Sequence, residues 1–213
     1  MPLTCCIYEL SKPLSLKEIT GKLERTRWSV QILGDEVENK VFRIISVERR
    51  EGRLTIFLKI YAGDQRLEKI LKVRIISFRG HTYLLAFASK KIVSKIAKSI
   101  ADVLGVEVST IVIQQSKLRK IYEGKTIKLV VFDMVRVPGL RKVTLSGSSV
   151  ADTDAFREYI SVCEVSYVLF EWMGFIVGIS VSGTVVCLSK IDEEVFFKLI
   201  EEELIPLVVS TSI

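Results

Sequence analysis

Cationic and aromatic side chains alternate with apolar ones along one predicted strand, residues 53–61. Successive side chains of a strand point to opposite faces, so the apolar set faces a core and the cations and rings face outward. Rings stack on nucleic-acid bases and cations meet phosphates. We therefore predict a nucleic-acid-binding face. Its residues, from this strand and the next one along the chain, are Arg53, Phe57, Lys59, Tyr61, Lys72 and Arg74. The alternative interpretation is an ordinary solvated sheet face, or one that other parts of the chain cover.

Residues able to carry out acid–base or nucleophilic catalysis are few. His81 is the one imidazole of the sequence and follows a predicted turn, which favours a surface or hydrogen-bonded role over that of a base. Helix capping explains the local carboxylate pair Asp152 and Asp154. Residues 178–183 (GISVSG) miss the nucleophile-elbow pattern by one position, and neither glycine-rich phosphate-binding pattern occurs. We predict a non-enzymatic protein with no catalytic residue and no cofactor.

The four cysteines, Cys5, Cys6, Cys163 and Cys187, show no C-x-x-C spacing and have a single distant histidine, so no metal site is expected. We interpret all four as reduced core residues. A disulfide between Cys163 and Cys187 stays open. The sequence has a single asparagine and many charged residues, as in hyperthermophiles, and those organisms keep some intracellular disulfides.

Charge is distributed unevenly along the chain. Residues 1–142 contain 28 Lys and Arg and 14 Asp and Glu, a net charge of +14. Residues 143–213 contain 3 and 11, a net charge of −8. Two halves of opposite sign indicate two kinds of partner. We predict that the basic half binds nucleic acid, with DNA favoured, and that the acidic half binds protein.

A run of glutamates closes the last predicted helix. Glu201, Glu202 and Glu203 lie at its C-terminal end, where the helix dipole disfavours negative charge. A basic partner surface, such as the first half of another copy, would favour them, so we predict that these residues bind a partner. The uncharged residues 208–213 could add a strand to that partner. We expect a protein partner or self-association rather than a strict monomer.

The elements that must position these residues fall into two similar series. Residues 72–78 and 81–88 are predicted to form a hairpin, followed by a helix that starts after Ser89 and ends at Gly105. Hairpin strands and a helix return in residues 168–204. We predict an α+β fold of two related modules, each an antiparallel sheet with a C-terminal helix packed on it. The basic module spans residues 1–114 and the smaller acidic module residues 125–213, with a basic connector at 115–124.

This order resembles the repeat of TATA-binding-protein-like domains, in which a strand and a helix precede an antiparallel sheet and a long terminal helix. The hairpin-plus-helix units at residues 73–105 and 168–204 carry the resemblance. In that family the concave sheet binds the DNA minor groove with apolar wedges and paired asparagines, so the resemblance implies DNA binding. The family's fold also serves roles without DNA. The alternative function is a protein-binding adaptor or assembly subunit, whose basic face contacts acidic protein.

Residues 172–189 are uncharged and approach the length of a membrane span. Their β-branched residues and three glycines instead predict buried hairpin strands. The first ten residues lack a basic region followed by a long apolar run, so no signal peptide is expected. We expect a cytoplasmic protein that has no contact with a membrane.

Overall fold

The computed structural model describes residues 2–25, 29–32, 40–50, 52–62, 65–133 and 139–206. The fold is α+β, with antiparallel strand pairs and helices packed on them, as the sequence predicts. The chain divides into two compact units. Residues 5–110 form the N-terminal unit, and residues 1–4 together with residues 111–213 form the C-terminal unit.

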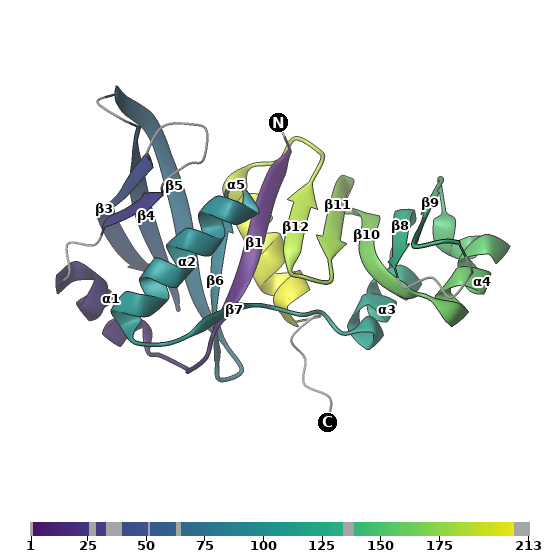
Figure 1. Cartoon of the computed structure of the whole chain (residues 1–213), viewed down its shortest axis with the longest axis horizontal. Coiled ribbons are helices and arrows are strands. Elements are labelled where there is room, and N and C mark those ends of the chain that lie inside the picture. Colours follow the sequence, from purple (N-terminus) through teal and green to yellow (C-terminus); the bar gives the residue numbers. More distant parts are fainter. Residues whose placement is uncertain are drawn as a thin grey trace. The chain divides into compact units, whose positions relative to one another are not determined.

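The N-terminal unit is an antiparallel sheet with two helices on one face (Figure 1). Its strands are β1 (Leu3–Leu10), β2 (Ser29–Ile32), β3 (Lys40–Arg50), β4 (Arg53–Ala62), β5 (Gln65–Phe78) and β6 (His81–Phe87). They lie in the order β2-β3-β4-β5-β6-β1, and β7 (Val108–Thr110) pairs with the end of β1. The helices α1 (Leu16–Arg25) and α2 (Lys90–Leu104) cover what we call the inner face.

Side-chain alternation decides which face of this sheet is buried. Leu54, Ile56 and Leu58 of β4 are fully buried on the inner face. They share a core with the apolar stripe of α2, which includes Val93, Ile96, Ala97, Ile100 and Leu104. Because successive residues of a strand alternate in direction, the side chains between these, from Arg53 to Tyr61, lie on the opposite, outer face, while Ile60 packs against the core.

The predicted hairpin turn and helix end are both confirmed. Arg79 (φ 49°) and Gly80 (φ 80°) join β5 to β6, and positive φ at both central positions is the signature of the type I′ hairpin turn. Gly105 ends α2 in the left-handed conformation (φ 70°). Lys22 Nζ donates to the Leu104 carbonyl at 2.6 Å, which satisfies one of the acceptors left over at a helix C-terminus.

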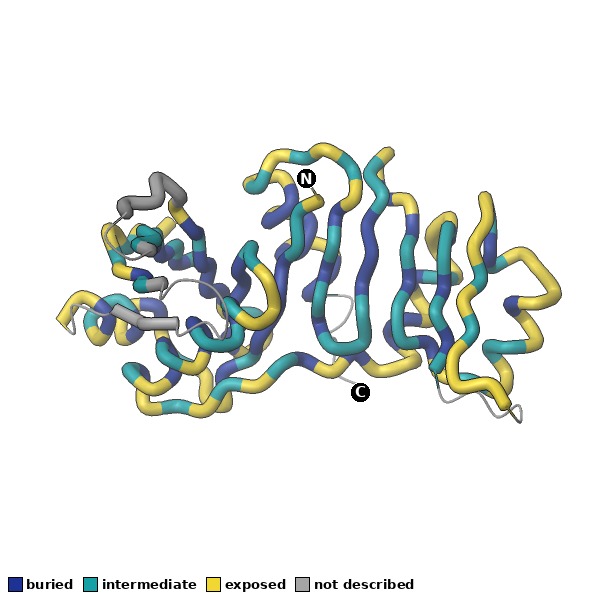
Figure 2. The backbone as a smooth tube through the Cα atoms, turned by 45° about the horizontal axis from the view of Figure 1, so that its top comes forward, coloured by how far each residue is buried: buried dark blue, intermediate teal, exposed yellow. Residues whose placement is uncertain are grey.

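The C-terminal unit also consists of antiparallel strands and helices. Its strands are β8 (Ile127–Asp133), β9 (Lys142–Ser146), β10 (Glu164–Trp172), β11 (Phe175–Ser180) and β12 (Thr184–Cys187), in the order β12-β11-β10-β8-β9. The helical segments are α3 (Gln115–Gly124), η1 (Val150–Asp152), α4 (Asp154–Val162), α5 (Glu193–Leu199) and the π-helical turn η2 (Ile200–Leu204). Buried and less buried residues alternate along β10 (Figure 2). The uncharged residues 172–189 contain β11, β12 and the end of β10, so they form strands, as predicted.

The segment predicted as a connector, residues 115–124, is helix α3 of the C-terminal unit. Leu118 and Ile121 are buried at helical spacing. The Gln115 side chain makes two hydrogen bonds to the backbone of Val165 in β10, donating from Nε2 at 2.9 Å and accepting through Oε1 at 3.1 Å. The exposed residues of the helix are mostly polar, among them Arg119, Lys120 and Glu123, and this composition is what predicts a connector.

A tyrosine ring occupies the space above Gly178 in β11. A Cβ at this position would lie 1.8 Å from the Tyr167 hydroxyl oxygen. Tyr167 is half-buried there, and this burial raises the pKa of its phenol. Glycine at position 178 is thus required by the close approach of the ring rather than by the backbone conformation.

We expect Gly178→Ala to displace the Tyr167 ring and to lower the free energy of unfolding by about 1–2 kcal/mol, the scale of a mild overpacking change. Urea denaturation measures this change. In a Tyr167→Ala background the same substitution should cost much less, because no ring then occupies the space. As a matched control, Gly21→Ala in α1, where nothing lies within 4 Å of the new Cβ, should stabilise the protein by about 0.5–1 kcal/mol. Equal destabilisation in both Tyr167 backgrounds would contradict this role of the ring.

Candidate nucleic-acid interface

The outward side chains of β3, β4 and β5 form a surface that we call the basic–aromatic face. Strand register places its residues side by side. They are Arg43 and Ile45 of β3, Arg53, Phe57, Lys59 and Tyr61 of β4, and Ile70 and Lys72 of β5. This set contains five of the six residues predicted from the sequence, and it adds three that the sequence analysis did not name.

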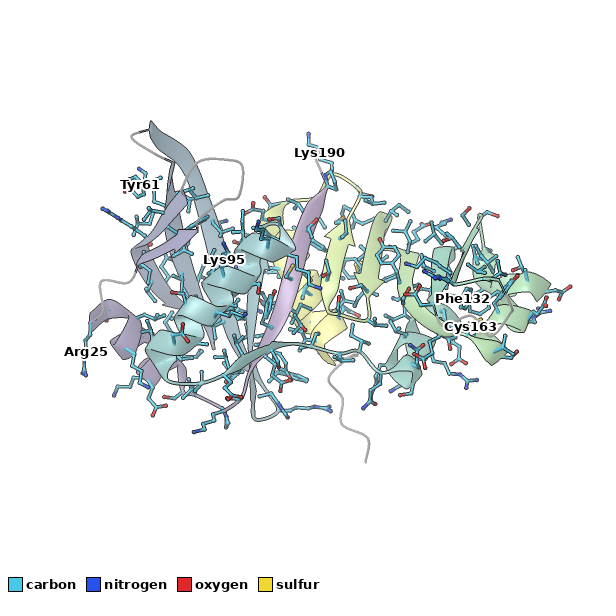
Figure 3. The ribbon with its side chains drawn as sticks, in the orientation of Figure 1. Arg25, Tyr61, Lys95, Phe132, Cys163 and Lys190 are labelled. Carbon is cyan, nitrogen blue, oxygen red and sulfur yellow. The ribbon has the colours of Figure 1, made fainter. Side chains whose placement is uncertain are left out.

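A cation and a ring from neighbouring strands meet at one end of this face. Arg43 lies directly opposite Lys59 in the β3–β4 register. Its guanidinium carbon is 5.3 Å from the centroid of the Tyr61 ring, within the range of a cation–π interaction. In Figure 3, Tyr61 is labelled at the strands of this unit and Lys95 at helix α2. The face thus presents two cations and a ring within one small area.

Phe57 occupies the middle of the face, beside a β-bulge. Ile44 pairs with Leu58 and Ser46 pairs with Phe57, so β3 has one extra residue at Ile45. On the other side of β4, Phe57 pairs with Lys72 of β5. Phe57 therefore has Ser46 and the bulge residue Ile45 on one flank and a lysine on the other.

Two isoleucines give this face exposed apolar area. Ile45 is 49% exposed and Ile70, opposite Lys59, is 50% exposed. Side chains of this kind are costly to leave in water and are typical of binding surfaces when they cluster with rings. The sequence does not reveal Arg43 and Ile45 as part of this face because the bulge at Ile45 interrupts the two-residue alternation of β3. A reader of the sequence cannot then assign both ends of the strand to the same face.

Arg74 differs from the other predicted residues. It is only 5% exposed, whereas Lys72 on the same strand is partly exposed. Arg74 pairs with Leu85 of β6, which is fully buried, so the outer side of the sheet is closed at this position. A guanidinium that is nine-tenths buried offers little surface to a polyanion, and we leave Arg74 out of the basic–aromatic face.

Arg53 lies at the other end of β4, opposite Arg50 of β3. Glu48 lies nearby on β3 and forms an exposed ion pair with Arg50, with Nη2 and Oε2 3.3 Å apart. Such pairs contribute about 0–1 kcal/mol, so the acid lowers the local charge without fixing the structure. This end of the face is consequently less positive than the end at Arg43.

The other residues considered for catalysis have local structural roles. His81 Nδ1 lies 2.6 Å from Glu9 Oε1, and the His81 ring stacks on Tyr83. Asp154 accepts a hydrogen bond from Arg157 at 2.7 Å, and Asp152 accepts one from Ser149. A hollow of about 680 Å³ beside Gly105 is lined by Ser11, Lys12, Asp102, Gly105, Val106 and Glu107. At the hollow, Ser11 Oγ accepts a hydrogen bond from the Glu107 backbone N–H at 3.0 Å.

The three glutamates predicted to bind a partner lie in η2, the π-helical turn that follows α5. Glu202 and Glu203 are exposed, whereas Glu201 is 8% exposed. An outside partner could therefore reach the first two more readily than the third. The predicted added strand, residues 208–213, lies outside the described residues.

All four cysteines are free thiols in the structure. The disulfide between Cys163 and Cys187 that the sequence left open is absent. Cys5, Cys6 and Cys187 are buried, and Cys163 is partly exposed. Burial raises the pKa of the Cys187 thiol, although its Sγ donates a hydrogen bond to the Ser189 carbonyl at 3.5 Å.

Comparisons with other proteins do not assign a family. No protein-family model matches the sequence, and a search of curated proteins found no match. Within the described ranges, no group of three or more His, Cys, Asp or Glu side chains is placed to hold a metal ion. In the same part of the chain, every helix is too short or too polar to cross a lipid bilayer.

We expect the thiols to react with an aromatic disulfide reagent in two classes. Because only the thiolate attacks and burial disfavours it, Cys163 should react quickly in the folded protein while Cys5, Cys6 and Cys187 react slowly. In denaturant all four thiols should titrate at once. A Cys163→Ser variant should lose the fast phase alone. A total of two thiols in denaturant would instead indicate a disulfide.

Proposed function

We propose that the N-terminal unit binds nucleic acid through the basic–aromatic face, without catalysing a reaction. The observation that carries the proposal is the placement of the Arg43 guanidinium over the Tyr61 ring and directly opposite Lys59. Cations neutralise phosphates, and rings and guanidinium groups stack on bases. The face lies on the side of β4 that the core does not use, so binding requires no rearrangement of the sheet.

The charge of the two units agrees with this assignment. The N-terminal unit has 20 Lys and Arg against 12 Asp and Glu, a net charge of +8. The C-terminal unit has 11 against 13, a net charge of −2. This contrast is smaller than that between the two halves of the sequence, because the eight cations of residues 111–142 belong to the C-terminal unit. The excess positive charge therefore lies on the unit that carries the basic–aromatic face.

We also propose that the two units are related to each other as internal repeats. Both contain a hairpin with two positive-φ residues at its turn, Arg79-Gly80 in one and Met173-Gly174 in the other. The element order differs, since β8 and β9 precede α4 whereas α1 directly follows β1. We keep the resemblance to TATA-binding-protein-like domains for the N-terminal unit, in which a strand and a helix precede β2–β6 and the long helix α2.

A second function, contact with a protein partner, is favoured by the exposed Glu202 and Glu203 of η2. Negative charge at a helix C-terminus receives no benefit from the helix dipole, so a basic partner would improve its environment. This function is compatible with nucleic-acid binding, since the two surfaces lie on different units. If it stands alone, the protein is an adaptor or assembly subunit, and its basic–aromatic face contacts acidic protein.

The charge-reversing variant Arg43→Glu/Lys59→Glu should lose nearly all binding to nucleic acid, because both cations face the same place on the surface. Fluorescence anisotropy of a labelled oligonucleotide, measured across a salt series, gives the result. In the milder Arg43→Gln/Lys59→Gln variant, two phosphates of a single strand are no longer neutralised. The slope of log K against log salt should then fall in magnitude by roughly 1.4, which is about 0.7 for each phosphate.

The control is Lys98→Glu/Lys91→Glu on α2, which makes the same change in net charge at exposed positions of a helix on the opposite face. Its affinity should fall far less than that of the Arg43/Lys59 variant. Equal reductions in the two variants would mean that net charge alone drives binding. No binding by the unaltered protein at low salt would remove the proposal and favour the adaptor.

A further inference from the structure

We infer that the ligand of the basic–aromatic face is single-stranded nucleic acid, with separate bases stacked at Phe57 and at Tyr61. This inference rests on the proposed function and specifies its ligand. It follows from the spacing of the two rings, from the cations beside each of them and from the way a duplex covers the faces of its bases.

The two rings are placed to meet different bases. Phe57 and Tyr61 lie four residues apart on the same face of β4. A strand advances about 3.3–3.4 Å per residue, so their Cα atoms are about 13 Å apart. Stacked bases in a helical strand repeat every 3.4 Å, roughly a quarter of that spacing. The rings thus contact bases that are not neighbours in a continuous stack, which requires a strand whose bases are open.

Each ring has a cation at its side. Lys59 lies between the two rings on β4, Arg43 stacks on Tyr61, and Lys72 pairs with Phe57. A backbone that follows β4 therefore meets positive charge at each step, while its bases reach the rings. This interleaving of cations and rings is the arrangement of sequence-tolerant single-strand binders.

A duplex fits this face less well than a single strand does. Base pairs inside a duplex present their edges in the grooves and keep their faces covered by stacking. The cations could still contact phosphates, but Phe57, Tyr61, Ile45 and Ile70 would gain little.

The test compares binding of labelled oligonucleotides of about 15 nucleotides, within the usual range of single-strand site sizes. The probes are oligo-dT, oligo-U and a mixed-sequence DNA duplex, each measured with the full chain at about 50 and 200 mM salt. We expect at least one single strand to bind about tenfold more tightly than the duplex. The two single-stranded arms distinguish DNA from RNA.

Ring variants then locate the stacking. Phe57→Ala and Tyr61→Ala should each raise the Kd for the single strand by about 5- to 150-fold, with an unchanged salt slope. Phe57→Tyr and Tyr61→Phe should keep most of the affinity, because each retains a ring. Phe175→Ala, which removes a half-buried ring in the C-terminal unit, should leave the affinity unchanged. Thermal unfolding checks each variant, and Tyr61, near the end of β4, serves if Phe57→Ala unfolds.

The outcomes separate this inference from the function on which it rests. If neither single strands nor duplex bind at low salt, the proposed function fails. If the duplex binds as tightly as the single strands and both alanine variants are neutral, the single-strand inference is overturned while nucleic-acid binding stands. A weakening by the alanine variants that the ring-retaining variants do not recover would also overturn stacking.

Discussion

Burial of one side of β4 is the constraint on which the N-terminal unit depends. Leu54, Ile56 and Leu58 are fully removed from water, and each such side chain contributes about 1.5–3 kcal/mol relative to exposure. A slip of one residue would turn all three outward and bring Phe57 and Lys59 into the core. The core therefore holds the outer face in register. The arrangement of cations and rings follows from the packing on the other side of the same strand.

Much of this fold could be predicted from the sequence because its signals are local. Two-residue periodicity gives the strands, and glycines with positive φ mark the ends of β5 and α2. The features that the sequence does not predict depend on residues that are neighbours in space but not along the chain. Arg43 reaches Tyr61 only through strand pairing, and the burial of Arg74 depends on Leu85 beside it. The composition of residues 115–124 predicts a connector because most of them are polar, and the packing of Leu118 and Ile121 depends on neighbours elsewhere in the chain.

Cations over rings recur in the N-terminal unit. Arg79 lies 5.3 Å from the centroid of the Phe78 ring, the same separation as between Arg43 and Tyr61. Such contacts are worth about 0.5–1 kcal/mol at exposed sites, too little to fix a fold but enough to favour one side-chain orientation. A ring that is orientated before a ligand arrives loses less conformational freedom on binding. The contact therefore orients the ring in the free protein, and this orientation increases the affinity of a complex.

The bulge in β3 has a consequence for how the gene encoding this protein can change in length. Ile45 and Ser46 together oppose the single residue Phe57. Loss of either codon would restore regular pairing and leave the strand on both sides of the bulge in its present register. Loss of the Glu48 codon, closer to the turn, would instead move Val47, which packs against the core, to a position that faces outward. Natural variants one residue shorter in this strand should consequently be shortened at the bulge, with the residues on both sides retained.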